Sequence, residues 1–168
     1  KEAYKNVNEV CRQYGTKALL IGGKLALEAG REKLLQALAE GENPVTIVDT
    51  VLFGEECTYA GMEKIAAHVK KCGADMIFGM GGGKALDTAK GTAEKCGLPV
   101  FTFPTIASTC AATTALSVVY KEDGNFDSFY FYEKPARHSF IDTEIIAEAP
   151  EIRWENTLSA IFLREATG

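Results

Sequence analysis

The chain has 168 residues, of which 46% are hydrophobic and 24% are charged, and both shares are close to the average for globular proteins. This composition excludes a disordered chain, a collagen-like repeat and a strongly acidic or basic tail protein. The 18 Lys and Arg against 23 Asp and Glu give a net charge of −5, so we expect neither nucleic acid nor a membrane as a partner. The length predicts one domain, or one domain and part of a second, and the apolar runs are too short to cross a bilayer.

Cysteine and histidine are the residues that would reveal a disulfide framework or a zinc finger. The five cysteines are an odd number without a Cys-x-x-Cys pair, and His68 and His138 are the only histidines, so neither is expected. We expect reduced thiols in a cytoplasmic protein, some of them buried as small apolar residues. The sequence opens at Lys1 without a Met or a signal-peptide pattern, so we expect a clipped start that gives no information on targeting.

Short apolar runs alternate with stretches of helical periodicity through the first hundred residues. The runs predict buried strands at residues 17–21, 45–48, 76–78 and 100–103. The stretches between them predict helices whose apolar residues recur three or four positions apart, as do Met62, Ile65, Ala66 and Val69. Breakers of the helical pattern follow at Gly41, Pro44 and Gly73. The alternation of strand and helix predicts an α/β fold, with a parallel sheet and helices on both of its faces.

The sequence after the fourth strand has the pattern of a β-hairpin. Residues 115–120 and 128–132 are rich in β-branched and aromatic residues, and the segment that joins them contains Asp-Gly. A last short strand is expected at residues 139–141. Asp142 is expected to cap the helix that follows and runs toward Pro150.

Residues 79–83 hold four glycines between a predicted strand and a predicted helix. Glycine permits positive φ values and lets a phosphate approach the amide groups closely, and the helix N-terminus then favours an anion. The segment lacks the Gly-Lys-Ser/Thr ending of a Walker loop, and an ordinary dinucleotide fingerprint belongs after the first strand. The alternative is a tight packing turn without a ligand.

Asp87 and Lys90 share one face of the helix after this turn, and Lys84 lies one turn before Asp87. We expect the three side chains to line a cleft at the carboxyl ends of the strands, and a solvated surface pair is the alternative. Residues 104–109 follow the fourth strand, so they should open on the same edge, where their hydroxyl and amide groups could bind a pyrophosphate or a nicotinamide amide.

Several ordered segments together resemble the glycerol dehydrogenase branch of the iron-containing alcohol dehydrogenase superfamily. These segments are residues 81–90, 104–109, 115–120 and 142–146, the last with Ala149-Pro150. The resemblance covers roughly residues 1–150 and implies that they form a Rossmann-like NAD(P)-binding domain. It also implies a following all-helical domain that carries a divalent metal, of which residues 151–168 would be the truncated start.

The resemblance further implies which residues bind the cofactor. By role, these are the turn residues Gly81, Gly82, Gly83 and Lys84, of which the last two would touch the pyrophosphate; Thr105 and Ser108 at the cofactor's middle and nicotinamide end; Thr114, Leu116 and Tyr120 at the nicotinamide ribose or ring; and Asp87 as a structural anchor in the same cleft. The protein's task would be to place the nicotinamide carbon against a carbinol carbon.

Two places depart from that branch. Glycerol dehydrogenases have an Asp beside the bound polyol where this chain has Cys110, so Cys110 is either a neighbour of the substrate or a small buried filler. The first strand ends at Gly23 and Lys24, where NAD-using relatives place an Asp on the adenosine ribose. Gly23 leaves room for a 2′-phosphate and Lys24 would pair with it, which admits NADP beside NAD, whereas a solvated Lys24 is the alternative.

The family's metal ligands are an Asp just after Ala-Pro and two later histidines, and residues 151–168 contain neither residue type. His68 and His138 match neither ligand position. We therefore expect a divalent metal, Zn or Fe, from the family, but no ligand for it in this chain. The metal would polarise the alcohol oxygen and lower its pKa for hydride loss.

Together these features predict an NAD(P)-dependent oxidoreductase of the glycerol or polyol dehydrogenase type, of which this chain is an incomplete part. Its substrate would be a small alcohol or polyol, and the family implies a homo-oligomer. The alternatives are a nucleotide-binding homologue without activity and a dehydroquinate synthase-like lyase on the same scaffold.

Overall fold

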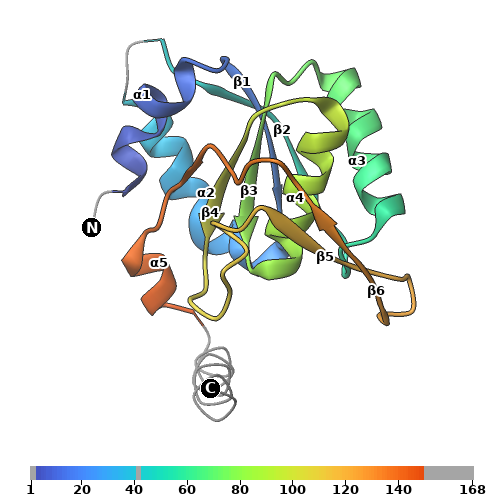
Figure 1. The fold of residues 1–168 in the computed structure, drawn as a ribbon. Coiled ribbons are helices and arrows are strands. Elements are labelled where there is room, and N and C mark those ends of the chain that lie inside the picture. The colour runs from blue at the N-terminus through green and yellow to red at the C-terminus, as the bar shows by residue number, and fades with distance from the viewer. Residues whose placement is uncertain (1–2, 41–42, 150–168) are drawn as a thin grey trace.

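A parallel sheet forms the centre of the computed structural model, which describes residues 3–40 and 43–149. Its strands lie in the order β2-β1-β3-β4-β7, and Figure 1 labels the first four of these. They are β1 (Lys17–Gly22), β2 (Thr46–Leu52), β3 (Met76–Gly81), β4 (Val100–Pro104) and β7 (His138–Ser139). The order of the strands along the chain reverses between β1 and β3, and such a switch point is where open α/β sheets bind ligands.

Helices cover both faces of the sheet, as predicted. They are η1 (Ala3–Asn6), α1 (Val7–Arg12), α2 (Lys24–Ala39), α3 (Tyr59–Cys72), α4 (Gly83–Cys96) and α5 (Thr143–Ala147). Figure 1 shows α1, α2 and α5 on one side of the sheet and α3 and α4 on the other. Successive residues of β1 enter the two different cores, because Leu20 packs with Leu34 of α2 whereas Leu19 packs with Val69 of α3.

The helix α4 lies unusually close to the strand β3. A Cβ atom on Gly79 would lie only 2.6 Å from the Cβ of Ala89, so the glycine is required for this approach. The close packing directs the N-terminus of α4 to the carboxyl end of β3. Gly79 therefore has a packing role, which was the alternative to phosphate binding in the sequence analysis of this turn.

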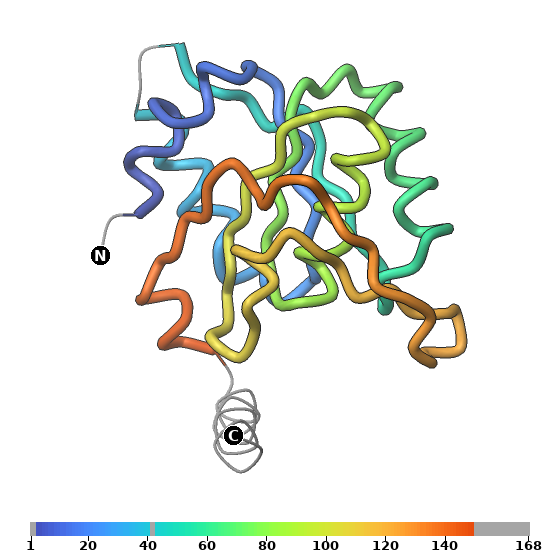
Figure 2. Tube along the Cα trace, viewed as in Figure 1, coloured from blue at the N-terminus to red at the C-terminus, as the bar shows by residue number. Residues whose placement is uncertain are grey.

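The predicted hairpin is confirmed, and it packs against α3 and α4. Its strands β5 (Leu116–Tyr120) and β6 (Phe126–Phe131) are antiparallel, and Val119 is buried against Met62 of α3. The Tyr59 ring lies 5.9 Å from the Tyr130 ring. Figure 2 shows the tip of the hairpin projecting from the body of the molecule.

Several elements differ in extent from the prediction. β2 continues to Leu52 instead of ending at residue 48, and β3 extends through the first glycines of the turn to Gly81. The last strand shrinks to the two residues of β7, and η1 and α1 were not predicted. The expected start of a helical domain at residues 151–168 lies outside the described residues. Within the described part of the chain, no helix has the length and apolar character needed to cross a membrane.

Candidate cofactor site

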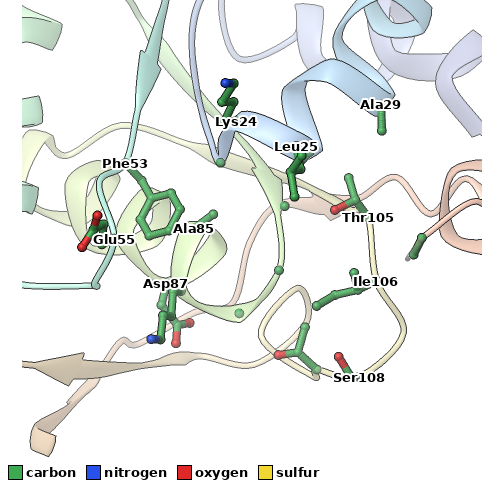
Figure 3. Close-up of a pocket in the computed structure, with 18 of the residues that line it drawn as sticks. Lys24, Leu25, Ala29, Phe53, Glu55, Ala85, Asp87, Thr105, Ile106 and Ser108 are labelled. Atoms are coloured by element: carbon green, nitrogen blue, oxygen red, sulfur yellow. The ribbon is translucent and has the colours of Figure 1, made fainter. Parts of the chain in front are cut away.

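A cleft of about 700 Å³ opens at the carboxyl ends of β1, β2, β3 and β4, next to the switch point of the sheet. Figure 3 shows its two walls, with Phe53 and Glu55 on one side and Thr105, Ile106 and Ser108 on the other. The cleft contains most of the residues that the sequence assigned to the cofactor, namely Gly23, Lys24, Gly81, Gly82, Gly83, Lys84, Asp87, Thr105, Ser108 and Tyr120. A volume of this size lies within the usual range for cofactor sites, which is about 300–1,000 Å³.

Two helices begin at this cleft without a side-chain cap. The N-cap of α2 is Gly23 and the N-cap of α4 is Gly82, and neither residue has a side chain that could satisfy the first N–H groups. These groups and the positive ends of the two helix dipoles therefore remain available to an anion in the cleft. Gly81 just before has a φ of +147°, a region that glycine adopts readily and other residues rarely do.

The loop after β4 lies against the glycine turn, as predicted. The amide of Thr105 donates a hydrogen bond of 3.2 Å to the carbonyl of Gly81. A Cβ atom on Gly83 would lie 3.1 Å from the hydroxyl of Thr109, and one on Gly82 would lie 2.7 Å from Ile106. The glycines thus allow the loop to pack closely against the turn, and they have no side chains of their own that would cover the first amides of α4.

Lys84 lines the cleft and has two partners that the sequence did not reveal. Its Nζ forms an ion pair with Oε1 of Glu56, and it lies 5.3 Å from the centre of the Tyr120 ring. The Lys84 side chain is 47% exposed, whereas that of Glu56 is 23% exposed. A cation therefore stands at the N-terminus of α4, on the side of the cleft that Tyr120 occupies.

Asp87 and Lys90 form a buried ion pair of 2.8 Å, which excludes the solvated surface pair considered above. The other carboxylate oxygen of Asp87 accepts a hydrogen bond of 3.0 Å from the amide of Val118, and its carbonyl accepts one of 2.9 Å from the hydroxyl of Ser117. Asp87 thus holds β5 against α4, which supports its expected role as a structural anchor. Lys90 does not line the cleft, in contrast to the expectation for the three side chains.

Thr114 and Leu116 do not line the cleft either, and their carbonyl oxygens accept hydrogen bonds from Lys90 Nζ. Cys110 is exposed, so it is not the buried filler that the sequence left as an alternative, and it too lies outside the cleft lining. The cofactor and substrate roles of these three residues remain predictions.

The ring of Phe53 lies close to Gly23, just after the end of β1. A Cβ atom on Gly23 would lie 3.3 Å from this ring, so the room that Gly23 was expected to leave for a 2′-phosphate is bordered by Phe53. Lys24 begins α2 and lines the cleft beside it. No carboxylate at this position opposes a phosphate on the adenosine ribose.

Part of the cleft wall was missed by sequence reasoning. The missed lining residues come from the loop after β2, from the hairpin and from α5 with its C-cap, and include Phe53, Gly54, Glu55, Val118, Ile145 and Glu148. The extended β2 brings its loop to the same edge as the other strands. Ile145 had no local signal, because α5 reaches the cleft only through the fold of the whole chain.

The described residues do not fit a metal site. Within residues 3–40 and 43–149, no three His, Cys, Asp or Glu side chains come together as ligands. His68 of α3 instead pairs with Asp49 of β2 at 2.7 Å, and this hydrogen bond lowers the pKa of the Asp49 carboxyl. His138 lies on β7.

Comparison with known proteins decides the family. Residues 1–143 match the family described as iron-containing alcohol dehydrogenase. The chain belongs to that family. It is 38% identical over 136 residues to the glycolaldehyde reductase of Halobacterium salinarum, a match that covers 81% of this chain and 36% of the relative. It is 33% identical over 151 residues to the glycerol dehydrogenase of Escherichia coli O6:H1, over 89% of this chain and 40% of the relative.

The fold agrees with the family. The crystal structure of glycerol dehydrogenase from Schizosaccharomyces pombe superposes with a TM-score of 0.76 at 32% identity, over 90% of this chain and 38% of that chain. The chain therefore spans about two fifths of the length of the relatives that it matches. The resemblance inferred from the glycine turn and the segments after it is confirmed at the level of the family.

Proposed function

We propose that this chain is the nucleotide-binding part of an NAD(P)-dependent oxidoreductase that acts on a small alcohol or polyol. The observation that carries the proposal is the convergence of two uncapped helix N-termini, at Gly23 and Gly82, on one cleft at the switch point of the sheet. The names of the relatives, glycerol dehydrogenase and glycolaldehyde reductase, favour a redox reaction over the lyase-like alternative.

The residues that line the cleft supply the groups that a dinucleotide needs. The amides of Gly82 and Gly83 and the cation of Lys84 would hold the pyrophosphate, and the hydroxyls of Thr105 and Ser108 would hydrogen-bond the adjoining part of the cofactor. When bound, the nicotinamide accepts or donates a hydride. The protein's own part is to fix the ring near Tyr120 and to keep the phosphates neutralised.

NADP remains a candidate beside NAD. Gly23 has no side chain, so no carboxylate at this position opposes a 2′-phosphate. Lys24 lines the same corner of the cleft and would be its cation. These two features support NADP, whereas the ring of Phe53 restricts the space beside Gly23.

The remaining parts of the activity are proposals for the protein as a whole. We propose a small alcohol or polyol as the substrate, with Cys110 as its neighbour. We also propose a divalent metal, Zn or Fe, whose ligands are not among the described residues. We further propose that residues 1–150 form the cofactor domain and that the protein assembles as a homo-oligomer. A cytoplasmic location is supported by the five cysteines, which are all free thiols.

The test is a titration of the purified chain with NAD, NADH, NADP and NADPH, followed by nucleotide fluorescence or calorimetry. Saturable binding at micromolar concentrations is the expected result, and the tightest ligand identifies the cofactor. Failure of all four nucleotides to bind would overturn the proposal for this chain.

A further inference from the structure

Lys84 is the cation of the proposed phosphate site, yet it is already paired in the structure. Its Nζ forms an ion pair with Oε1 of Glu56, which lies in the loop after β2. Glu56 itself is not part of the cleft lining, whereas Lys84 is. The ion pair therefore joins the cleft to a carboxylate just behind its wall.

Among residues 3–40 and 43–149, Lys84 is the one partner of the Glu56 carboxylate. Its second oxygen, Oε2, is buried and has no hydrogen-bond partner. A carboxylate with one buried, unpartnered oxygen is costly when its remaining cation is removed. Separating Lys84 from Glu56 therefore costs free energy, and this cost disfavours any process that needs the separation.

Binding of a pyrophosphate is such a process. The phosphates would approach the N-terminus of α4, where Lys84 is the second residue of the helix, and would attract the same ammonium group. The contact of Lys84 with the Tyr120 ring, at 5.3 Å, leaves the ammonium on the cleft side of Glu56. Two anions thus compete for one cation.

We propose that Glu56 is a positioning residue that competes with the cofactor's pyrophosphate for Lys84, so that Lys84 changes partner when the nucleotide binds. This inference rests on the proposed function. Glu56 holds the affinity of the cleft below the value that the helix N-termini and Lys84 alone would give. A weaker hold on the nucleotide speeds its release, and release of product is the step that limits turnover in many enzymes.

The test compares nucleotide affinity in the chain and in Glu56→Gln. Glutamine keeps the shape of the side chain and removes the competing charge, so binding of NADH and of ADP-ribose is expected to tighten about five-fold, the equivalent of one exposed ion pair. Adenosine, which has no phosphate, is expected to bind the two proteins equally. A gain in affinity cannot result from damage to the fold, and unchanged or weaker binding of NADH would overturn the inference.

Two further variants separate competition for Lys84 from the simple loss of a negative charge. Glu122→Gln removes an exposed carboxylate that lies outside the cleft lining and is not paired with Lys84, and it is expected to change affinity by less than about two-fold because solvent and salt screen it. In a Lys84→Met background, Glu56→Gln is expected to give no gain beyond that of Glu122→Gln. An equal gain from Glu122→Gln, or a persistent gain without Lys84, would overturn the inference while leaving the proposed function intact. Failure of the unaltered chain to bind NADH would overturn the proposed function, and the inference with it.

Discussion

Gly83 begins α4 and lines the cleft, and a Cβ atom there would lie 3.1 Å from the hydroxyl of Thr109. We predict that Gly83→Val abolishes measurable nucleotide binding, because the branched side chain would stand beside the amides that hold the phosphate in the proposed site. The fold should persist, with a change in the free energy of unfolding of about 1 kcal/mol or less, since the position is in the first turn of a helix. Calorimetric titration with NADH and a thermal melt measure the two effects.

Gly61 offers a matched control for this substitution. It lies in the first turn of α3, and a Cβ atom there would also lie 3.1 Å from a threonine hydroxyl, that of Thr58. Gly61 is not part of the cleft lining, so Gly61→Val should leave NADH affinity unchanged. Retained binding in Gly83→Val would refute the assignment of the phosphate to the turn.

Lys24 is the residue that would distinguish the two dinucleotides. If it pairs with a 2′-phosphate, Lys24→Ala should weaken NADPH binding by about ten-fold or more, the value of a charge-assisted hydrogen bond, and spare NADH. Parallel titrations with NADH and NADPH measure the difference. An equal loss for both nucleotides would indicate general destabilisation, and no loss for either would mean that Lys24 is a solvated lysine.

At the scale of single residues, the sequence predicts where a side chain lies better than which groups it contacts. The sequence correctly predicted Lys84 and Asp87 in the cleft, because a glycine turn before a helix fixes where the first helical residues point. It did not predict that Lys90 is buried, because a lysine three positions after an aspartate is usually solvated. Lys90 is buried because its Nζ donates hydrogen bonds to the carbonyl of Leu116 in the hairpin and to that of Thr114 just before it.

The contact between α4 and the hairpin rests on the buried ion pair of Lys90 with Asp87. We predict that Lys90→Met lowers the free energy of unfolding by about 3–5 kcal/mol, because it leaves the Asp87 carboxylate buried without its cation. Urea denaturation monitored by far-UV circular dichroism measures the loss. The double variant Asp87→Asn with Lys90→Met should recover part of it, since the unpaired charge is then gone.

An exposed ion pair of the same helix, α4, provides the control for the buried pair. Lys95 pairs with Glu63 at 3.1 Å on the surface, where Glu63 is 70% exposed. Lys95→Met should therefore cost less than about 1 kcal/mol. Equal losses for Lys90→Met and Lys95→Met would contradict the structural role given to the buried pair.

The short helix α5 is tied to α2 by Asp142, which the sequence identified as a cap. Its carboxylate accepts a hydrogen bond of 3.0 Å from the amide of Glu144 and forms an ion pair of 2.7 Å with Lys33 of α2. Burial alone would raise the pKa of Asp142, but the hydrogen bonds from Lys33 and from the amide of Glu144 outweigh it, so the pKa lies below its usual range. The ionised form therefore stabilises the folded chain.

We predict that Asp142→Asn lowers the free energy of unfolding by about 1–2 kcal/mol at pH 7, because asparagine still caps the helix but loses the charge-assisted bond to Lys33. The contribution of Asp142 is complete above the pKa of an unfolded aspartate, about 3.9, and is lost as the pH falls through the lower pKa of the folded state. The difference between the chain and the variant should therefore shrink below about pH 4. Urea titrations at several pH values test this, and a difference that stays constant down to pH 2 would contradict it.

Strands and helices were predictable to the extent that their signals are local. The apolar run of β1 and the stripe of α3 located both elements, and Asp-Gly located the turn of the hairpin. β2 was placed too short, because Asp49 and Thr50 interrupt its apolar run although the edge position of the strand tolerates them. The first helices were missed because α1 has only six residues, too few for a periodic pattern.

At the scale of the whole molecule, the fold class could be predicted from the sequence, but the full lining of the cleft could not. Alternation of strands and helices led to a parallel sheet with both faces covered, and the family match and the fold bear this out. The cleft could not be predicted in this way, since its lining residues run from Gly23 to Ala149, and the approach of α5 depends on the contact of Ile145 with the core beside Gly30. Contacts of such long sequence separation leave no pattern in a single sequence.

Because the cleft is built from segments distributed along most of the described chain, nucleotide binding should stabilise the molecule as a unit. At a free NADH concentration one hundred times the dissociation constant, linkage predicts a gain of about 2.7 kcal/mol in the free energy of unfolding. For a chain of this length that gain raises the midpoint of thermal unfolding by about 5–10 °C. Differential scanning calorimetry at increasing NADH concentrations should show one transition that moves upward. The same series with Gly83→Val should leave the midpoint in place, and an equal upward shift in that variant would place the nucleotide outside the glycine turn.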